Sequence, residues 1–494
     1  MERFDAIVIG AGHNGLSAAA ALGARGKRVC VLERSSQVGG MAADGRLAHL
    51  VYNLSESEKR RLGLNLSAIN TISLARDVAH VAIRGGAAEF ADGRAHPNAA
   101  AYAQLHARLV RFAGVLAHLA EAPPPGFEGG LTSLEGLREI ARLGKVGLGL
   151  KRLGKAEMRE FLRVILSNAF DVILDEIPDG PLAGALAADA VRGAWAGPRS
   201  PGTVFSLMYR LGQGGEVFRP VGGMTAVAAA YAEAACRAGC DVRTDAPVAR
   251  VMVENDRAAG VELADGTKIA ASAVLSSAGP LQTMLLAGVG HFDVEAARRA
   301  RTMRAKGSAA KLNLTLSARP AFNGLNEAQH AARLLVAPSA AEVERAFNPA
   351  KYGELPKAPV LEMVLDGARL SVIAGHVPTE PQGGWTKAAR DRLASIVIDT
   401  IEPHAPGLAA LVTNVEVLTP ADIAEMTGAP GGHWHHAEMG LDQVLTLRPI
   451  AGNARYRLAV HGLYLCGASA HPGGDVTGLP GRNSAAQLLA DGVL

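Results

Sequence analysis

The N-terminal segment has a strand–helix–strand pattern of hydrophobic positions. A continuous apolar run at 6–9 predicts a parallel strand that is buried on both faces. An alanine-rich stretch with helical character follows, and a second apolar run at 28–32 predicts the next strand. Strands that alternate with a helix in this way are typical of a parallel sheet, so we expect an α/β domain.

Later parts of the chain add further strands and helices. A helical stretch at 224–238 precedes short strands separated by turn residues, which is typical of a β-meander, at 242, 248–253, 260–263 and 268–277. The pattern from about 77 to 210 is helical, with a break at the prolines 123–125. A second, interleaved domain is predicted from the strands at 311–316, 359–365 and 369–374 and the helix at 386–401. The chain closes with a strand at 463–466 and a helical tail.

Composition and charge narrow the functional classes. Of the 494 residues, 49% are hydrophobic and 20% are charged, which is typical of a globular protein with two or three domains. The net charge of +3 gives no argument for a nucleic-acid partner. The N-terminus does not resemble a signal peptide, and no run approaches the roughly 18 apolar residues of a membrane span. We therefore expect a cytoplasmic protein that is attached at most to a membrane surface.

The cysteines do not form a recognisable redox or metal motif. Cys236 and Cys240 are one helical turn apart, and Cys30 and Cys466 are isolated in the sequence. Because neither a C-x-x-C pair nor a histidine partner accompanies them, we expect reduced, packed thiols and not a zinc or dithiol site.

The predicted first strand ends in a G-x-G-x-x-G motif formed by Gly10, Gly12 and Gly15. In this motif the first glycine permits a tight turn, the second lets a pyrophosphate approach the backbone, and the third lets the helix pack on the strand. The helix start offers free N–H groups to the phosphates. Glu33, at the end of the second strand, is placed to bind a ribose hydroxyl. The motif predicts a dinucleotide but does not distinguish NAD from FAD.

The segment after Glu33 resembles a known family. R-S-S-Q-V-G-G, 34–40, is similar to the glycine doublet of flavoproteins in the glutathione-reductase-like superfamily, especially the amine oxidase and phytoene desaturase branch. In that branch the doublet, here Gly39 and Gly40, brings a second loop against the FAD pyrophosphate. Many relatives have arginines around the doublet. This chain has Gln37 and Met41 instead, so no arginine clamp on the phosphates is expected at these two positions.

The C-terminal loop carries a second glycine cluster, with glycines at 467, 473, 474 and 478. In the family that the chain resembles, this loop and the helix after it meet the flavin ring. Backbone N–H groups bind the N1/O2 edge there, and the helix dipole stabilises the reduced ring. We expect glycines in this loop because side chains would block the approach of the ring.

Taken together, the segments GAGHNGL, VGGM, GGHWHHAEMGLDQ and GLYLCGASAHPGGDVTGLPGRN resemble the phytoene desaturase-like branch over nearly the whole chain. The resemblance implies an α/β (α+β) fold with a Rossmann-type FAD-binding domain, at 1–76, 215–295 and 451–494. An interleaved substrate domain of mixed sheet and helices takes 77–214 and 296–450. FAD is the implied cofactor, with Val248 against the adenine, and the implied binding residues are Gly10, Gly12, His13, Asn14, Gly15, Glu33, Arg34, Gly39, Gly40, Met41, Val248, Gly467, Gly474, Asp475 and Val476.

The densest polar and aromatic cluster is G-G-H-W-H-H-A-E-M-G-L-D-Q at 431–443. In the family pattern it lies near the isoalloxazine, and a histidine of near-neutral pKa can act as a general base. We expect His436 as the base and Glu438 as its orienting partner, with His471 in the glycine loop as a competing candidate. A structural loop whose histidines cap backbone groups is the open alternative. The cluster lacks the ligand spacing of a zinc site, so no metal is expected.

The expected reaction is an FAD-dependent dehydrogenation or desaturation of an apolar substrate, such as a polyene or another isoprenoid, with hydride transfer to flavin N5. A second G-x-G-x-x-G for NAD(P)H is missing, as is the redox cysteine pair of disulfide reductases, so oxygen or a quinone is the expected electron acceptor. A flavin amine oxidase is an alternative, although the glycine loop offers no tyrosine for its usual aromatic cage. A redox-neutral isomerase and a non-catalytic flavin-binding scaffold are further alternatives.

The segment 138–163 combines eight basic residues with three glutamates and interspersed leucines. Such a helix can lie on an anionic membrane, but a solvated charged face over a packed helix gives the same pattern. Beside the small-molecule substrate, two partners are left open: a membrane surface, and a second copy of the chain in a homodimer.

Overall fold

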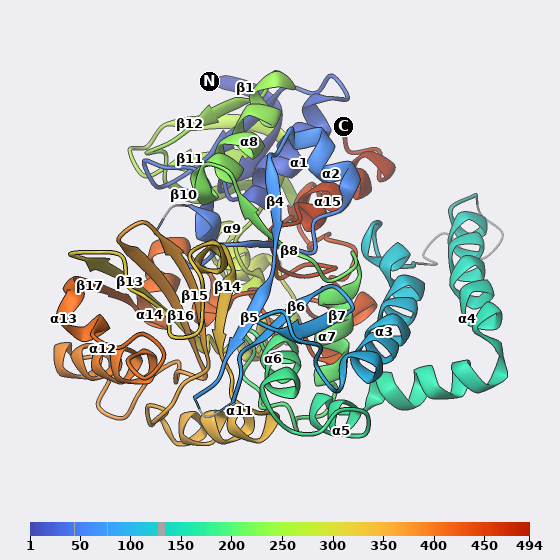
Figure 1. The fold of residues 1–494 in the computed structure, drawn as a ribbon. Coiled ribbons are helices and arrows are strands. Elements are labelled where there is room, and N and C mark those ends of the chain that lie inside the picture. The colour runs from blue at the N-terminus through green and yellow to red at the C-terminus, as the bar shows by residue number, and fades with distance from the viewer. Residues whose placement is uncertain (44, 77, 127–133) are drawn as a thin grey trace.

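The first sheet is built from strands at the beginning, the middle and the end of the chain (Figure 1). The computed structural model describes residues 1–43, 45–76, 78–126 and 134–494. The strand order is β10-β11-β12-β1-β2-β9, and β18 also pairs with β12. The strands are β1 (Glu2–Ile9), β2 (Val29–Leu32), β9 (Asp241–Arg243), β10 (Val248–Glu254), β11 (Arg257–Leu263), β12 (Lys268–Ser276) and β18 (Leu463–Leu465). The predicted parallel strands are present, and the antiparallel meander comprises β10–β12. The strand at 242 was predicted as part of the meander, which is wrong: it is β9 and pairs in parallel with β2.

Helix α1 (His13–Gly23) packs against both α8 (Gly223–Arg237) and α15 (Leu479–Ala490) beside this sheet. The centre of β1 is fully buried, as its continuous apolar run predicts. A Cβ atom on Gly481 would lie 1.8 Å from the backbone oxygen of Asn14. Glycine is therefore required there, because α15 approaches α1 at backbone distance.

The second sheet has the order β17-β13-β16-β15-β14-β5-β6-β7. Its strands are β5 (Thr71–Leu74), β6 (Val81–Arg84), β7 (Ala87–Phe90), β13 (Ala309–Leu316), β14 (Arg333–Val336), β15 (Leu361–Asp366), β16 (Arg369–Gly375) and β17 (Val412–Leu418). The leucines of β13 join one apolar core with α12 (Lys387–Ile401). Because strand side chains alternate between faces, Lys311 and Asn313 lie on the opposite face, where both donate hydrogen bonds to the segment 45–47.

The helical domain begins later than the sequence pattern indicates. The stretch from about 77 to 210 is predicted as helical throughout, which is wrong for the hairpin β6–β7. Two glycines, Gly85 and Gly86, connect these strands, and such a pair between short strands is a hairpin signal. The helices that follow are α3 (Ala99–Ala120), α4 (Leu134–Leu166), α5 (Ala169–Leu174), α6 (Pro181–Ala190) and α7 (Thr203–Leu211).

A small third sheet, in the order β3-β8-β4, connects the two larger ones. It comprises β3 (Val51–Tyr52), β4 (Leu66–Ile69) and β8 (Val217–Pro220). The segment 1–76 therefore contributes to all three sheets, since β5 already belongs to the second one. The remaining helices are α2 (Glu56–Leu62), α9 (Pro280–Ala287), α10 (Val294–Thr302), α11 (Ala340–Phe347), α13 (Leu408–Leu411) and α14 (Pro420–Thr427).

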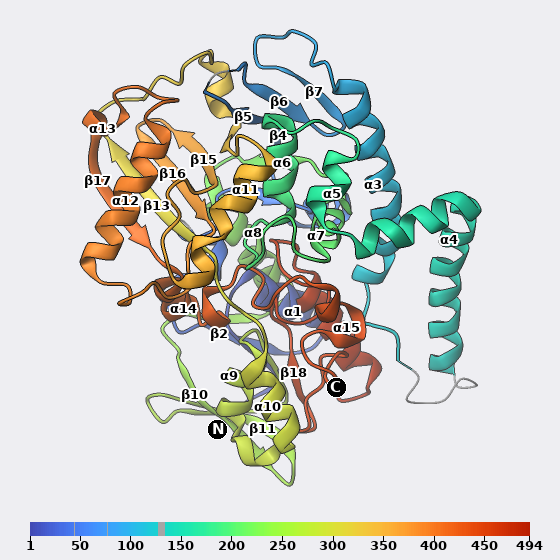
Figure 2. The ribbon, with the colours of Figure 1, turned by 90° about the horizontal axis from the view of Figure 1, so that it is seen from below.

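Helix α4 projects from the rest of the molecule in both views (Figures 1 and 2). It bends at Gly154, and Leu137, Leu148 and Leu162 are exposed along it. The side chains of Arg138 and Arg142, which belong to the predicted basic face, lie outside the described residues. Membrane contact through this helix stays a prediction. Within the described ranges, no helix is both long enough and apolar enough to span a bilayer.

Candidate functional site

A cleft of about 760 Å³ lies at the carboxyl ends of four parallel strands. β1, β2, β12 and β18 each end one or two residues before a residue that lines it: Gly10, Glu33, Ser277 and Gly467. Ligands of open α/β sheets bind at this edge, because the strand ends and the following loops form a crevice there. The volume lies in the upper part of the range for small-molecule sites, as a dinucleotide requires.

The three glycines of the G-x-G-x-x-G motif have different surroundings. A Cβ atom on Gly10 would lie 2.2 Å from Ser277 Oγ, and one on Gly15 would lie 2.0 Å from the Gly10 oxygen. A Cβ on Gly12 would have no neighbour closer than the Gly40 Cα at 4.0 Å. Gly10 and Gly15 are therefore needed for packing, whereas Gly12 leaves open space in the cleft wall that a pyrophosphate can use.

Glu33 and Asn14 provide polar atoms at the end of the cleft formed by the G-x-G-x-x-G motif and β2, which we call the nucleotide end. The Glu33 carboxylate accepts N–H groups from Ala11 at 2.8 Å and from Ser35 at 2.9 Å, which fixes its orientation. Each carboxylate oxygen can accept a further hydrogen bond from a ribose hydroxyl. The side-chain oxygen of Asn14 is buried, lines the same cleft and has no partner among the described residues. Both side chains thus have unused capacity for a polar ligand.

The glycine doublet lies against the first motif. Gly39 donates its N–H to the Ala11 oxygen at 2.8 Å and forms a bridge with Gly12. Arg46, which the sequence interpretation overlooked, lines the cleft beside the doublet and donates to the Gly40 oxygen at 3.2 Å. Arg34 also lines the cleft. These two guanidinium groups can provide the positive charge that is missing at positions 37 and 41.

Val248 lines the cleft next to Pro247, in the position expected for the adenine end. At the opposite end, the wall is formed by His13 and Met41 and by the loop residues Gly467, Gly474, Asp475 and Val476. We call this the ring end, because the resemblance places the flavin ring at this loop. All the residues predicted to contact the cofactor lie along the cleft except Gly15, which packs behind Gly10.

The loop glycines are required for a reason that the sequence analysis did not give. Cβ atoms would lie 2.1 Å from the Ser277 oxygen at Gly467, 2.8 Å from the His435 Cα at Gly474 and 2.8 Å from the Ser17 Oγ at Gly478. These contacts are with the protein itself. Close packing of the loop on its neighbours therefore already requires these glycines, and the approach of the ring as a further reason stays a prediction.

The histidine cluster is only partly directed at the cleft. Trp434 and His436 line the ring end. Glu438 does not orient His436, contrary to the prediction, because it contacts His433 Nε2 at 3.2 Å and accepts the N–H of Trp195 at 3.2 Å. His471 is turned toward α3, with its Nε2 2.7 Å from the Leu119 oxygen, and is not among the residues that line the cleft. The sequence gives spacing but not side-chain direction, which explains both errors.

His436 is a weak base in this environment. Burial, together with His13, His433 and Arg448, lowers the pKa of His436 to about 3. Its backbone has a left-handed conformation, with φ 58°, and its buried Nδ1 has no partner among the described residues. The imidazole is therefore neutral at pH 7 and is available as a hydrogen-bonding group. Its role as the base stays a prediction.

Arg448 joins the histidine cluster to the glycine loop. Its fully buried guanidinium donates to the backbone oxygens of His435, Glu438, Ala468 and Ala470 at 2.8–3.2 Å. One arginine thus satisfies four buried carbonyls from two chain segments. Nothing in the sequence around this position indicates this role.

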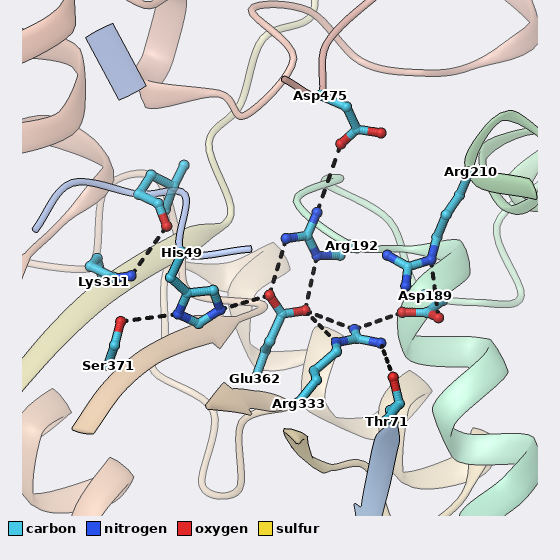
Figure 3. Close-up of polar contacts among 11 residues, drawn as sticks. His49, Thr71, Asp189, Arg192, Arg210, Lys311, Arg333, Glu362, Ser371 and Asp475 are labelled. Atoms are coloured by element: carbon cyan, nitrogen blue, oxygen red, sulfur yellow. Dashed lines mark hydrogen bonds and ion pairs between the residues drawn. The ribbon is translucent and has the colours of Figure 1, made fainter. Parts of the chain in front are cut away.

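Behind the ring end lies a buried charge network, shown in Figure 3. Glu362, on β15, accepts two hydrogen bonds of 3.0 Å from Arg192, one of 2.9 Å from Arg333 and one of 2.8 Å that involves His49 Nε2. Burial alone would raise the pKa of Glu362, but Arg192 and Arg333 hold it well below the ordinary value. The carboxylate is therefore ionised at neutral pH.

The network extends in two directions from Glu362. Arg333 bonds Asp189 at 2.7 Å, and Asp189 also pairs with Arg210 at 3.1 Å. Toward the cleft, the Arg192 guanidinium lies between the rings of Tyr52, at 3.9 Å, and Trp434, at 3.8 Å. Its Nη1 is 3.8 Å from the Asp475 carboxylate. Arg192 thus connects the second sheet to the wall of the cleft (Figure 3).

Comparison with known proteins assigns the family. The family model for flavin-containing amine oxidoreductases matches residues 15–330, which is more than half of the chain. The chain belongs to the flavin-containing amine oxidoreductase family. FAD is the cofactor of this family, and the open space at Gly12, the Glu33 carboxylate and the unpartnered Asn14 oxygen fit it.

Relatives of this flavoprotein carry several names. It is 29% identical to mouse "pyridine nucleotide-disulfide oxidoreductase domain-containing protein 2" over 99% of this chain and 94% of the relative. It is 27% identical to the lycopene-forming phytoene desaturase of a Paracoccus strain over 60% of this chain and 59% of the desaturase. A triple mutant of putrescine oxidase has a similar fold, with a TM-score of 0.59 at 14% identity and 99% coverage of both chains.

Among the described residues, neither a cysteine pair nor a tyrosine cage lines the cleft of this flavoprotein. All four cysteines are free, and none is among the residues that line the cleft. Burial raises the pKa of the Cys30 thiol to about 12. The two tyrosines closest in sequence to the glycine loop are turned elsewhere: the Tyr456 hydroxyl donates to the His471 oxygen at 2.9 Å, and the Tyr464 hydroxyl bonds Asp491.

Proposed function

We propose that this FAD-dependent oxidoreductase is a desaturase or dehydrogenase that removes two hydrogens from an apolar substrate such as a polyene or another isoprenoid. FAD supplies the hydride acceptor, its N5 atom, when it is bound. The observation that carries the proposal is the chemistry of the ring end. Its wall combines the apolar side chains of Met41, Leu47, Trp434 and Ala468 with the titratable side chains of His13, His436 and Asp475.

The apolar wall supports an apolar substrate for a simple reason. Met41 and Trp434 line the cleft and are half-buried, so an occupant of the ring end that covers them removes apolar surface from water and gains roughly 25 cal/mol for each Å² buried. Trp434 offers a ring face, whose other side is covered by the Arg192 guanidinium. The similarity to a phytoene desaturase points in the same direction.

An amine oxidase is the second candidate. Its support is the similarity in fold to putrescine oxidase and the Asp475 carboxylate, which can bind a cationic substrate. Against it, Tyr456 and Tyr464 are directed away from the cleft, so they do not form the usual cage. We propose oxygen or a quinone as the electron acceptor in either case, because no cysteine lines the cleft.

Anaerobic stopped-flow absorbance of the purified holoprotein tests the proposal. Mixing with polyenes or cyclic isoprenoids should bleach the flavin band, and mixing with primary amines should not. Bleaching by amines alone would contradict the desaturase and support the amine oxidase. Conversion of a polyene to an isomer by the prereduced holoprotein, without net bleaching, would identify an isomerase. A holoprotein that no donor bleaches and that converts nothing would be a flavin-binding scaffold.

A further inference from the structure

The cleft wall contains the carboxylate of Asp475, which is almost completely buried. Asp475 lies in the glycine loop at the ring end, with its backbone in the left-handed region at φ 65°. His13 Nε2 is 3.0 Å from the Asp475 backbone oxygen, which fixes the residue against the start of α1. Non-glycine residues in this conformation are uncommon and concentrate at functional sites.

The oxygens of the Asp475 carboxylate have unused capacity to accept hydrogen bonds or a proton. In the described part of the chain, no N–H or O–H group hydrogen-bonds to its oxygens, and the nearest cation is Arg192 Nη1 at 3.8 Å. Arg192 cannot move closer without giving up its two bonds to Glu362 and its place between two rings. The carboxylate is therefore held at a distance from its counter-charge, in the wall of the cleft at the ring end.

We propose that Asp475 is the group that takes the proton released by the substrate, and that Arg192 is its positioning residue; this rests on the proposed function. The substrate loses a hydride from one carbon to FAD and a proton from the neighbouring carbon to Asp475 Oδ. The electrons of that second C–H bond form the new double bond. When oxygen or a quinone takes the two electrons, it also takes this proton from Asp475, which restores the carboxylate.

The charges around Asp475 agree with this role. Burial raises the pKa of Asp475, while Arg192 and Arg210 act in the opposite direction. A base works best when its pKa is near the working pH, so a raised carboxyl pKa is favourable, whereas His436 with a pKa of about 3 is not. The titratable and charged groups that face Asp475 come from four elements or the loops beside them: His13, Asp189, Arg192, Tyr209, Arg210 and Glu362.

Asp475→Asn tests the proton acceptor, with Asp256→Asn as its matched control. Asp256 also has a left-handed backbone, at φ 59°, but lies in the exposed turn between β10 and β11. With a donor that bleaches the wild type, we expect Asp475→Asn to slow bleaching about 100-fold or more at equal FAD content. Asp256→Asn should match the wild type. A rate for Asp475→Asn within about threefold of the wild type, or a greater loss in His436→Asn, overturns the proposal.

Arg192→Gln tests the positioning role, because it should raise the pKa of the base. We expect the acid limb of the pH–rate profile to move to higher pH, with the plateau rate changed less than in Asp475→Asn. A merely structural role would lower FAD content or melting temperature without moving the limb. An unshifted limb in a folded, FAD-loaded Arg192→Gln protein contradicts the role of Arg192.

A redox titration separates this proposal from the proposed function, since it needs no substrate. Each proton taken up with two electrons changes the midpoint potential of bound FAD by about 30 mV per pH unit. In the wild type, the plot of midpoint potential against pH should therefore become steeper by this amount over the pH range in which Asp475 gains a proton on reduction of the nearby ring. That steeper segment should be missing in Asp475→Asn and shifted in Arg192→Gln. If no donor bleaches the wild type but the segment is present, the proposed function fails and the proton uptake at Asp475 stands; identical slopes in all variants overturn the inference.

Discussion

The two ends of the cleft are stabilised by different kinds of interaction. The nucleotide end is made mainly of β1, α1, β2 and the doublet that follows, which are adjacent in sequence and are joined by backbone contacts such as the Gly12–Gly39 bridge. The ring end combines Met41, Trp434 and Asp475, and behind them Arg192 and Glu362. The first end depends on glycines and main-chain geometry. The second depends on buried charges from distant segments, so the two should respond to different perturbations.

Acid should be the strongest perturbation, and it should act at the ring end. Burial lowers the pKa of His13 to about 4 and those of His49 and His436 to about 3. The unfolded chain binds protons at these histidines near pH 6.5, so between pH 6.5 and these values it holds more protons than the folded protein. Stability should therefore fall progressively as the pH drops below about 6.5. Denaturant titrations from pH 7 to pH 4 measure this, and a constant free energy of unfolding between pH 6.5 and 5 would contradict it.

Glu362→Gln should have the largest effect of any single substitution discussed. It leaves Arg192 and Arg333 buried near a neutral amide, and breaking a buried ion pair in this way costs about 3–5 kcal/mol. Glu262→Gln is the matched control, because Glu262 pairs with Arg250 at the surface of β11, where about 1 kcal/mol or less is expected. Thermal melts of both holoproteins make the comparison. Equal losses in the two variants would show that the network does not stabilise the ring end.

Alanine at two glycines of the same motif should affect different properties of the nucleotide end, stability at Gly15 and FAD affinity at Gly12. Gly15→Ala places a methyl group against the Gly10 oxygen, so we expect a loss of roughly 1–3 kcal/mol in stability even without FAD. Gly12→Ala has room in the protein and should leave the apoprotein melting temperature unchanged while weakening FAD binding. Calorimetric melts and FAD titration by fluorescence separate the two effects. A Gly12→Ala protein that binds FAD like the wild type would place the pyrophosphate elsewhere.

Tyr52→Phe should have the smallest effect. The Tyr52 hydroxyl is buried without a partner among the described residues, so its removal leaves no new unsatisfied group and should change stability by less than about 1 kcal/mol. The ring that covers the Arg192 guanidinium is retained. A larger loss, measured by the same melts, would mean that the hydroxyl contributes to the network through a bound water. That result would add a polar contact to the ring end.

Much of the fold and of the cofactor site could be predicted because the relevant signals are local. The run 6–9, the spacing of Gly10, Gly12 and Gly15 and the acid at Glu33 all depend on neighbours within a short segment. The hairpin β6–β7 was overlooked although Gly85 and Gly86 mark it. Arg46 was overlooked because the interpretation considered arginines only at the positions that flank the doublet.

The amino-acid sequence by itself determined the first strand–helix–strand unit, the dinucleotide motif and the acid at Glu33, because each is encoded by contiguous residues whose backbone conformation follows from local sterics. FAD as the cofactor was implied by the resemblance of several distant segments to one flavoprotein family. Only the tertiary structure decided that Glu438 contacts His433, that His471 turns toward α3, and that Arg192 lies between Glu362 and Asp475. The physical reason is that the energy of a buried charge depends on which partners the whole fold brings within a few ångströms. Residues 192, 362 and 475 are far apart in sequence, so no local pattern contains that information.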